Sequence, residues 1–291
     1  ILLFQYLFGE EADVAGTIPQ WIYYSFYIGA ILSLTTILWS VFKTAEIPPS
    51  DEELKEINKI KQLSLLNKMA KPFVEIREAV KEMPKFMWKI GAVYLFQWYA
   101  LFCYWQNSAK SIALSVWKVT PSSDPAAYEE AVGWAGLVNG WYNIVTFLSA
   151  FFLVTLAQKY GAKRVHFICL LLAGIGLLIF PMLENKYALF IPMTGFGIAW
   201  ASMMGIPYLL VVNEIPKERY GVYMGIINMM IVIPMIFQTL TFGYISKNFL
   251  NNDAGQAILF GGVLLLIAAV ATLRIKGSKA TASPSQAPSG H

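Results

Sequence analysis

The sequence has few charged residues. Asp, Glu, Lys and Arg make up 14% of the 291 positions, against about a quarter in a typical soluble domain. Hydrophobic residues make up 57%, and the mean hydropathy is +0.53. The apolar residues fall in long runs that are separated by polar segments. This composition indicates an all-α integral membrane protein. The net charge of +4 is modest and gives no reason to expect a nucleic-acid partner.

Cysteine and histidine are also scarce. The two cysteines, Cys103 and Cys169, both lie inside apolar runs, which argues against a disulfide framework. His166 and His291 are the two histidines, so a His/Cys metal site has almost no ligands. None of the 22 basic and 18 acidic residues lies deep in an apolar run. A membrane hydrolase needs such residues or a metal cluster, so we predict that the protein is not an enzyme and uses no cofactor.

The chain begins ILLFQYLF, without Met and without a basic segment before the apolar residues, unlike a signal peptide. We interpret residues 1–43 as a partial span and one full span that end an N-terminal bundle. Residues 44–85 are rich in both charges and predict a cytoplasmic amphipathic helix interrupted at Pro72. This segment is either a regulatory or partner-binding helix or, as we favour, a linker along the membrane face. Residues 276–291 are rich in Ser, Ala and Pro and predict a disordered tail.

A bundle of six spans is predicted over residues 86–275. About 20 helical residues cross a bilayer, and each apolar run has about that length or more. A polar connection is expected over 107–131. With the span before the linker, the predicted full spans are 20–42, 86–106, 133–156, 165–183, 187–213, 221–244 and 256–275.

The distribution of Lys and Arg predicts the orientation in the membrane. If residues 44–85 are cytoplasmic, 18 of the 22 basic residues lie in cytoplasmic segments, as the positive-inside rule requires. The remaining four are Lys110, Lys118, Lys186 and Lys247. We therefore predict a multi-pass protein of the plasma or inner membrane, with the central loop and the C-terminus in the cytoplasm and the lipid bilayer as its surroundings.

Polar and aromatic residues recur at helical spacing in several of the spans. Amides bind hydroxyl groups as donors and as acceptors, and aromatic rings cover apolar faces. The pattern therefore predicts a site for an uncharged polyhydroxylated small molecule. Aromatic rings near span ends also serve as interfacial anchors, and single amides often bond across helices. The candidate substrate-binding residues are Gln97, Trp98, Asn139, Tyr142, Asn143 and Asn228.

Helix-breaking residues are concentrated in the two runs 187–213 and 221–244, which a charged turn connects. Proline in a membrane helix needs neighbouring helices or a water-filled cavity to satisfy the freed backbone groups. We predict that these two runs form a gating hairpin. The candidate gating and packing residues are Gly205, Pro207, Gly221, Gly225 and Pro234.

Six spans after a central loop, with apolar third and sixth spans, resemble the C-terminal half of a major facilitator superfamily transporter. The segment LAQKYGAKRVH (156–166) is similar to the cytoplasmic loop motif of that superfamily. Gly161, Lys163 and Arg164 match the motif, whereas Gln158 replaces its acid and Ala162 its first basic residue. The resemblance implies alternating-access transport.

The segments GIAWASMMGIPYLLV and YGVYMGIINMMIVIPMI resemble the sucrose/maltose symporters of the glycoside–pentoside–hexuronide group. Met235 stands where that group often has Gln. The resemblance implies transport of a disaccharide or other glycoside, coupled to H⁺ or alternatively Na⁺. It also implies that an N-terminal half of about five further spans is missing. The alternatives are a membrane sugar sensor that does not transport, and an exporter of another small molecule.

Overall fold

The computed structural model divides the chain into two compact units, residues 1–74 and 75–291. The predicted partial span (1–8) and the predicted disordered tail (276–291) lie outside the described residues. The described residues contain helices, turns and no strand, as the predicted all-α class requires. They are 20–44, 48, 54–55, 58, 61, 64–212, 214–215 and 219–275.

The first unit contains α2 (Gln20–Lys43). Its 24 residues give a length of about 36 Å, which is sufficient to cross a bilayer. The hydroxyls of Thr35 and Thr36 donate to the carbonyls of Ile31 and Leu32, at 2.7 and 2.9 Å. These bonds satisfy two polar side chains within the helix, and most of the exposed side chains of α2 are apolar.

The linker region contains α4 (Leu65–Lys81), which runs through Pro72 without a break. The predicted interruption at Pro72 is therefore wrong. A proline inside a helix removes one backbone hydrogen bond, and the remaining bonds on both sides keep this helix continuous. The helix ends before Pro84, which directly precedes the next helix.

Beyond the end of α4, the described residues of the second unit form six long helices and two short ones. A π-helical turn, η2 (Ala113–Trp117), extends the first long helix, and a 3₁₀ turn, η3 (Phe180–Met182), follows the third. The long helices are α5 (Lys85–Ile112), α6 (Pro125–Tyr160), α7 (Ala162–Ile179), α8 (Phe190–Val212), α9 (Tyr220–Phe249) and α10 (Ala254–Thr272).

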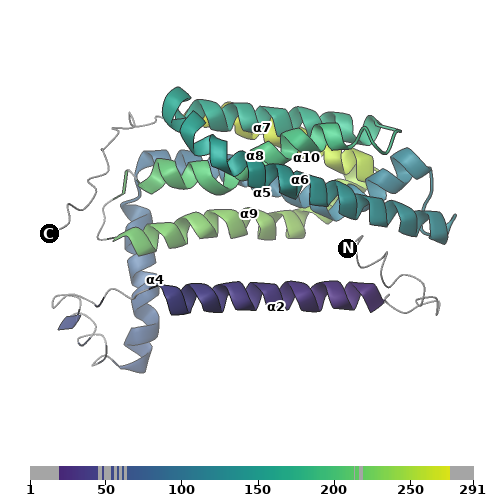
Figure 1. The fold of residues 1–291 in the computed structure, drawn as a ribbon. Helices are drawn as coiled ribbons and strands as arrows, with labels where there is room; N and C mark the ends of the chain where they lie inside the picture. The colour runs from purple at the N-terminus through teal and green to yellow at the C-terminus, as the bar shows by residue number, and fades with distance from the viewer. Residues whose placement is uncertain are drawn as a thin grey trace. The chain divides into compact units, whose positions relative to one another are not determined.

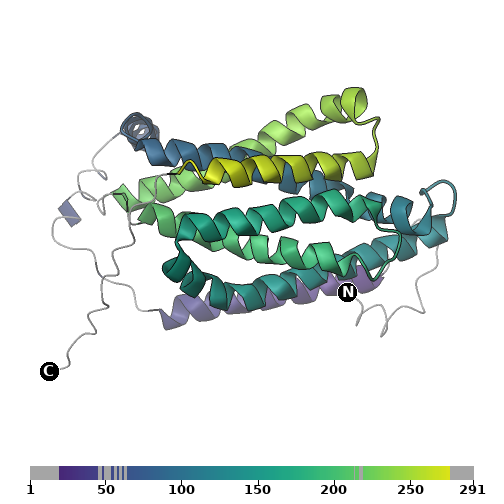
Figure 2. The same cartoon turned by 90° about the horizontal axis from the view of Figure 1, so that it is seen from above.

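The long helices of the second unit lie side by side along one common direction (Figures 1 and 2). Helix α5 packs against α9 and α10, and α7 packs against α8 and α10. Helix α8 packs in addition against α6. Helix α5 therefore lies between two neighbours, with polar and aromatic residues on the faces that it turns toward the bundle.

Glycine allows two of these helix pairs to approach closely. A Cβ added at Gly197 of α8 would lie 2.5 Å from the carbonyl oxygen of Tyr142 on α6. A Cβ added at Gly174 of α7 would lie 2.7 Å from a methyl group of Leu266 on α10. Small residues at such contacts let helix backbones meet, as is common in membrane bundles.

The helix ends follow from local sequence. Asp124 caps α6, because its carboxylate accepts a hydrogen bond from the Ala127 amide at 3.1 Å. Asp253 caps α10 in the same way through the Gln256 amide, at 2.7 Å. Between α6 and α7 the backbone turns at Gly161, whose φ of +90° suits glycine and strains other residues.

Six described helices are long and apolar enough to cross a membrane: α2 from Phe26, and α6 to α10, with α7 counted through Met182. Helix α5, predicted as a span over 86–106, has 28 residues and sufficient length, but is not among these six. The predicted polar connection over 107–131 is also shorter than expected, because α5 continues to Ile112 and α6 begins at Pro125.

Candidate functional site

Three neighbouring residues of α5 bury polar atoms that have no hydrogen-bond partner among the described residues. They are the Tyr94 hydroxyl, both atoms of the Gln97 amide and the Trp98 indole nitrogen. The exposed fraction is 0% for Gln97 and 5% for Trp98. An unsatisfied buried polar group costs about 1–3 kcal/mol. Three such residues on one helix turn therefore mark α5 as the most polar and least satisfied part of the bundle.

Three tryptophans form a contiguous aromatic group next to these atoms. Trp98 and Trp105 of α5 lie seven residues apart, on one face, and both contact Trp200 of α8 edge to face. The ring centroids of Trp200 are 5.7 Å from Trp98 and 5.4 Å from Trp105. Trp105 and Trp200 are partly exposed, whereas Trp98 is buried.

Sequence reasoning missed Trp200. A signal was present, because this tryptophan lies in the middle of a 23-residue apolar helix, far from the span ends where tryptophan usually anchors.

Asn228 of α9 bonds to α8. Its side-chain oxygen accepts a hydrogen bond from the Tyr208 hydroxyl at 3.0 Å. Tyr208 lies eight residues after Trp200 on α8, which places both rings on the same side of the helix. The Asn228 side chain is exposed and Tyr208 is partly exposed. The structure thus gives each of two predicted residues a partner on α8: Trp200 for Trp98 and Tyr208 for Asn228.

The predicted polar stripe of α6 is mostly used for packing between helices. Asn139 accepts a hydrogen bond from the Tyr104 hydroxyl of α5 at 2.9 Å. Tyr142 is 8% exposed and packs its ring against Phe196 of α8, with centroids 5.1 Å apart. Asn143 is exposed, and its amide donates to the Asn139 carbonyl at 2.8 Å, within its own helix. These three residues therefore already have partners within the protein.

A second polar seam joins α5 to α9. Gln238 of α9 donates to the side-chain oxygen of Gln106 at 3.1 Å, and its own oxygen has no described partner. One turn further, the hydroxyls of Tyr99 and Thr241 are 2.9 Å apart. This seam was not among the candidate site residues. With it, the polar side chains described on α5 extend from Tyr94 to Gln106.

The predicted gating residues divide into two groups. Pro207 and Pro234 lie inside α8 and α9 and are buried. By contrast, a Cβ added at Gly205, Gly221 or Gly225 would meet no atom within 4 Å. The close packing expected at these three glycines is therefore not found among the described residues. Close approach occurs instead at other glycines, of which Gly197 and Gly174 are examples.

The predicted cytoplasmic loop motif lies at the turn between α6 and α7. Gly161 makes the turn, and Lys163 donates from Nζ to the carbonyl of Leu273, just after α10, at 3.2 Å. Arg164 is exposed in the first turn of α7. The motif lysine therefore caps the end of another helix.

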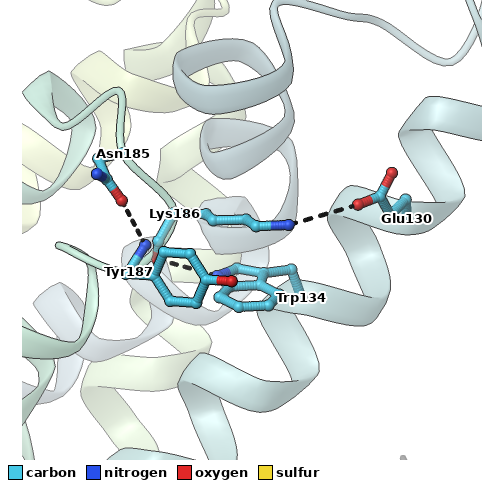
Figure 3. Close-up of polar contacts among 5 residues, drawn as sticks. All are labelled: Glu130, Trp134, Asn185, Lys186 and Tyr187. Atoms are coloured by element: carbon cyan, nitrogen blue, oxygen red, sulfur yellow. Dashed lines mark hydrogen bonds and ion pairs between the residues drawn. The ribbon is translucent and has the colours of Figure 1, made fainter.

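A cation–aromatic cluster fixes the loop between α7 and α8 at the other end of the bundle (Figure 3). The Lys186 ammonium lies 4.8 Å from the ring centroid of Trp134 and 3.8 Å from a carboxylate oxygen of Glu130. The Trp134 indole donates to the Lys186 carbonyl at 3.0 Å. In the same loop, Glu184 pairs with Lys118 at 2.6 Å. This pair holds the pKa of the Glu184 carboxyl below its ordinary value.

No group of three His, Cys, Asp or Glu side chains in the described ranges is arranged to hold a metal ion. The buried His166 of α7 lies 2.7 Å, at Nδ1, from the Ser202 hydroxyl of α8. That pair joins two helices and lacks further ligands within the described part of the chain. The buried polar side chains of the described bundle are thus this imidazole together with amides, hydroxyls and the Trp98 indole.

The family model of the Major Facilitator Superfamily matches residues 12–239 and 111–290, well over half of the chain. The chain belongs to the Major Facilitator Superfamily. No curated protein matches the sequence. Members of this superfamily are membrane transporters, which supports a general transport function rather than catalysis.

Proposed function

We propose that this superfamily member is a secondary transporter that moves a disaccharide or other glycoside across the membrane by alternating access. The observation that carries the proposal is the buried and unsatisfied amide of Gln97, which directly precedes Trp98, the residue whose ring contacts Trp200. A glycoside offers hydroxyls to an amide that both donates and accepts, and apolar C–H faces to the rings. The site has no charge, which suits a neutral substrate.

The burial of Gln97 fits a transporter that changes conformation. Trp105 and Trp200 are partly exposed and Asn228 is exposed, whereas Gln97 and Trp98 are buried. We propose that movement of α8 and α9 relative to α5 brings the buried amide to the sugar. Pro207 and Pro234 are the proposed flexible points of that movement, because each removes one backbone hydrogen bond within its helix.

The coupling ion and the opposite wall of the cavity are part of the same proposal. We propose H⁺ as the coupling ion, with Na⁺ as the alternative, and a second bundle N-terminal to this chain as the opposite wall. The described helices bury no carboxylate in the bundle. An intramembrane acid is the usual ion-coupling group, so the proposal assigns it to that second bundle. We further propose that residues 44–85 are cytoplasmic.

The experiment is uptake of a labelled glycoside into vesicles that contain the full-length protein. Accumulation above the external concentration, abolished by a protonophore, supports H⁺-coupled transport. Accumulation that requires Na⁺ and resists the protonophore selects the alternative ion. Saturable binding without accumulation supports a membrane sugar sensor instead. Efflux of apolar compounds without any glycoside uptake contradicts the proposed substrate class.

A further inference from the structure

A groove of about 770 Å³ runs between α5 and α10, away from the candidate site. Eight apolar side chains line it, together with two basic ones, Lys89 and Arg274. The two helices pack closely along their length (Figure 2). The volume lies within the range of ligand pockets, about 300–1,000 Å³. The groove is therefore large enough to hold a substantial apolar molecule.

The apolar part of the groove opens to the surroundings of the bundle. Val263, Ile267 and Val270 recur along α10 at helical spacing and are all exposed. Trp88 of α5, at the end that carries the charges, is 56% exposed. Because the chain is a membrane protein, an exposed apolar face on these helices is suited to hydrocarbon. Trp88 has the place that an interfacial tryptophan prefers, beside the charged groups.

The charges of the groove are concentrated at one end. Lys89 donates from Nζ to the Arg274 carbonyl at 3.0 Å, which uses one of its three N–H groups. The exposed Arg274 side chain forms no ion pair with any described carboxylate. Lys163 lies at the same place, bonded to the adjacent Leu273 carbonyl. Hydrogen bonding to the carbonyls at the end of α10 explains why Lys89 and Lys163 lie there, but it gives no role to the Arg274 side chain.

We propose that this groove binds an anionic phospholipid, with an acyl chain along α5 and α10 and the phosphate between Lys89 and Arg274. Arginine and lysine donors match phosphate oxygens, and basic pockets between membrane helices bind anionic lipid headgroups. The occupant is a lipid because the apolar length and the basic end adjoin in one groove. The proposal rests on membership of a membrane family and does not depend on the sugar.

The test uses the full-length protein purified in mild detergent with added phosphatidylglycerol or phosphatidylcholine of identical acyl chains. Native mass spectrometry counts the retained lipid, and the melting temperature gives a second readout. We expect preferential retention of phosphatidylglycerol and a higher melting temperature. Arg274→Gln should weaken that retention about fivefold, the effect of one basic residue near a lipid surface. Ala92→Phe, which fills the apolar part, should reduce retention of both lipids.

Lys159→Gln is the matched control, because it removes one charge from the same end of the bundle but outside the groove. It should retain phosphatidylglycerol like the wild type. Equal retention of the two lipids, or unchanged retention in Arg274→Gln, overturns the proposal. The same rise in melting temperature with glycerol phosphate, which has no acyl chain, would indicate a free-anion site and also overturns it. Unchanged retention in Ala92→Phe would exclude the groove, as expected if another protein segment fills it.

Discussion

Trp98 of α5 and Trp200 of α8 meet edge to face, with ring centroids 5.7 Å apart and ring planes at 75°. This contact joins a helix of polar and aromatic character to a helix that contains an internal proline. One member of the pair, Trp98, directly follows Gln97, whose buried amide has no partner among the described residues. The pair is therefore both a packing contact between two helices and the proposed apolar surface for a sugar ring.

Trp200→Ala should raise the KM for glycoside uptake while the protein still reaches the membrane. An aromatic contact contributes about 0.5–1.5 kcal/mol, so KM should rise roughly 2-fold to 12-fold if kcat is unchanged. Trp141→Phe is the control, since Trp141 is an exposed tryptophan of α6 outside the aromatic group. Kinetics of labelled glycoside uptake measure both variants. A wild-type KM in Trp200→Ala would remove this ring from the site.

Gln97→Leu separates a functional role of the amide from a structural one. Leucine is similar in size and removes two buried polar atoms that have no described partner. We expect the free energy of unfolding to rise by about 1–3 kcal/mol, while uptake is lost. Denaturant unfolding in detergent and vesicle uptake give the two values. Full uptake in this variant would show that the amide does not bind substrate.

Gln106→Leu, on the same helix, should lower the free energy of unfolding, whereas Gln97→Leu should raise it. Gln106 accepts a hydrogen bond from Gln238, which is buried. Its removal leaves the Gln238 amide without that partner, so we expect destabilisation by about 1–3 kcal/mol. If Gln97→Leu and Gln106→Leu change the free energy of unfolding in the same direction, hydrogen bonding does not explain the contribution of these two amides to stability.

The sequence predicted the helices better than it predicted the contacts between them. Periodicity placed Gln97 and Trp98 on one face of α5, because helical spacing depends on a single chain segment. It missed Trp200, whose partners lie on another helix about 100 positions away. It grouped Asn143 with Asn139, whereas the structure leaves Asn143 exposed and bonded within α6. Such differences depend on the rotation of a helix against its neighbours, which local sequence does not determine.

Helix boundaries show the same limit. The polar residues 107–111 indicated a loop, but they include neither proline nor glycine, and α5 continues through them to Ile112. The Ser108 and Ser111 side chains are buried there by tertiary packing. Conversely, Pro72 indicated a break that α4 does not show. At α10, which Asp253 caps, the predicted start at residue 256 lies two residues from the observed start at Ala254.

The pair of Lys118 and Glu184 should make stability depend on pH. The hydrogen bond and charge of Lys118 hold the pKa of Glu184 below its ordinary value of 4.5. The folded state therefore binds the proton more weakly than the unfolded state. The stabilisation is fully present above pH 4.5 and is lost as the pH falls through the lower folded pKa. Both side chains are exposed, so the effect is small and weakens with salt.

Glu184→Gln checks this dependence. The variant should melt below the wild type at neutral pH, and the difference should disappear at acidic pH. Glu129→Gln is the control, since Glu129 is an exposed acid of α6 for which no ion pair is found in the described part of the chain. Melting temperatures at several pH values measure all three proteins. A constant difference across the pH range would mean that the ion pair does not cause it.

Two glycines of α8 should respond oppositely to alanine. At Gly197 the new Cβ would lie 2.5 Å from the Tyr142 carbonyl, so α6 and α8 must separate. Overpacking of this kind costs typically about 1–3 kcal/mol. At Gly205 the new Cβ meets nothing within 4 Å, and alanine favours the helix by roughly 0.5–1 kcal/mol. Denaturant unfolding should therefore show Gly197→Ala destabilised and Gly205→Ala unchanged or stabilised.

Gly205→Ala also tests the proposed movement of α8, because Gly205 lies two residues before Pro207. If this part of the helix bends during transport, the alanine variant should be stable, should bind glycoside normally and should transport it more slowly. A lower kcat with an unchanged binding constant identifies a conformational step, since a lost contact to the sugar would weaken binding. Wild-type kcat in a stabilised Gly205→Ala protein would place the moving part of α8 elsewhere. Gly205 would then be a helix position that contributes neither to packing nor to transport.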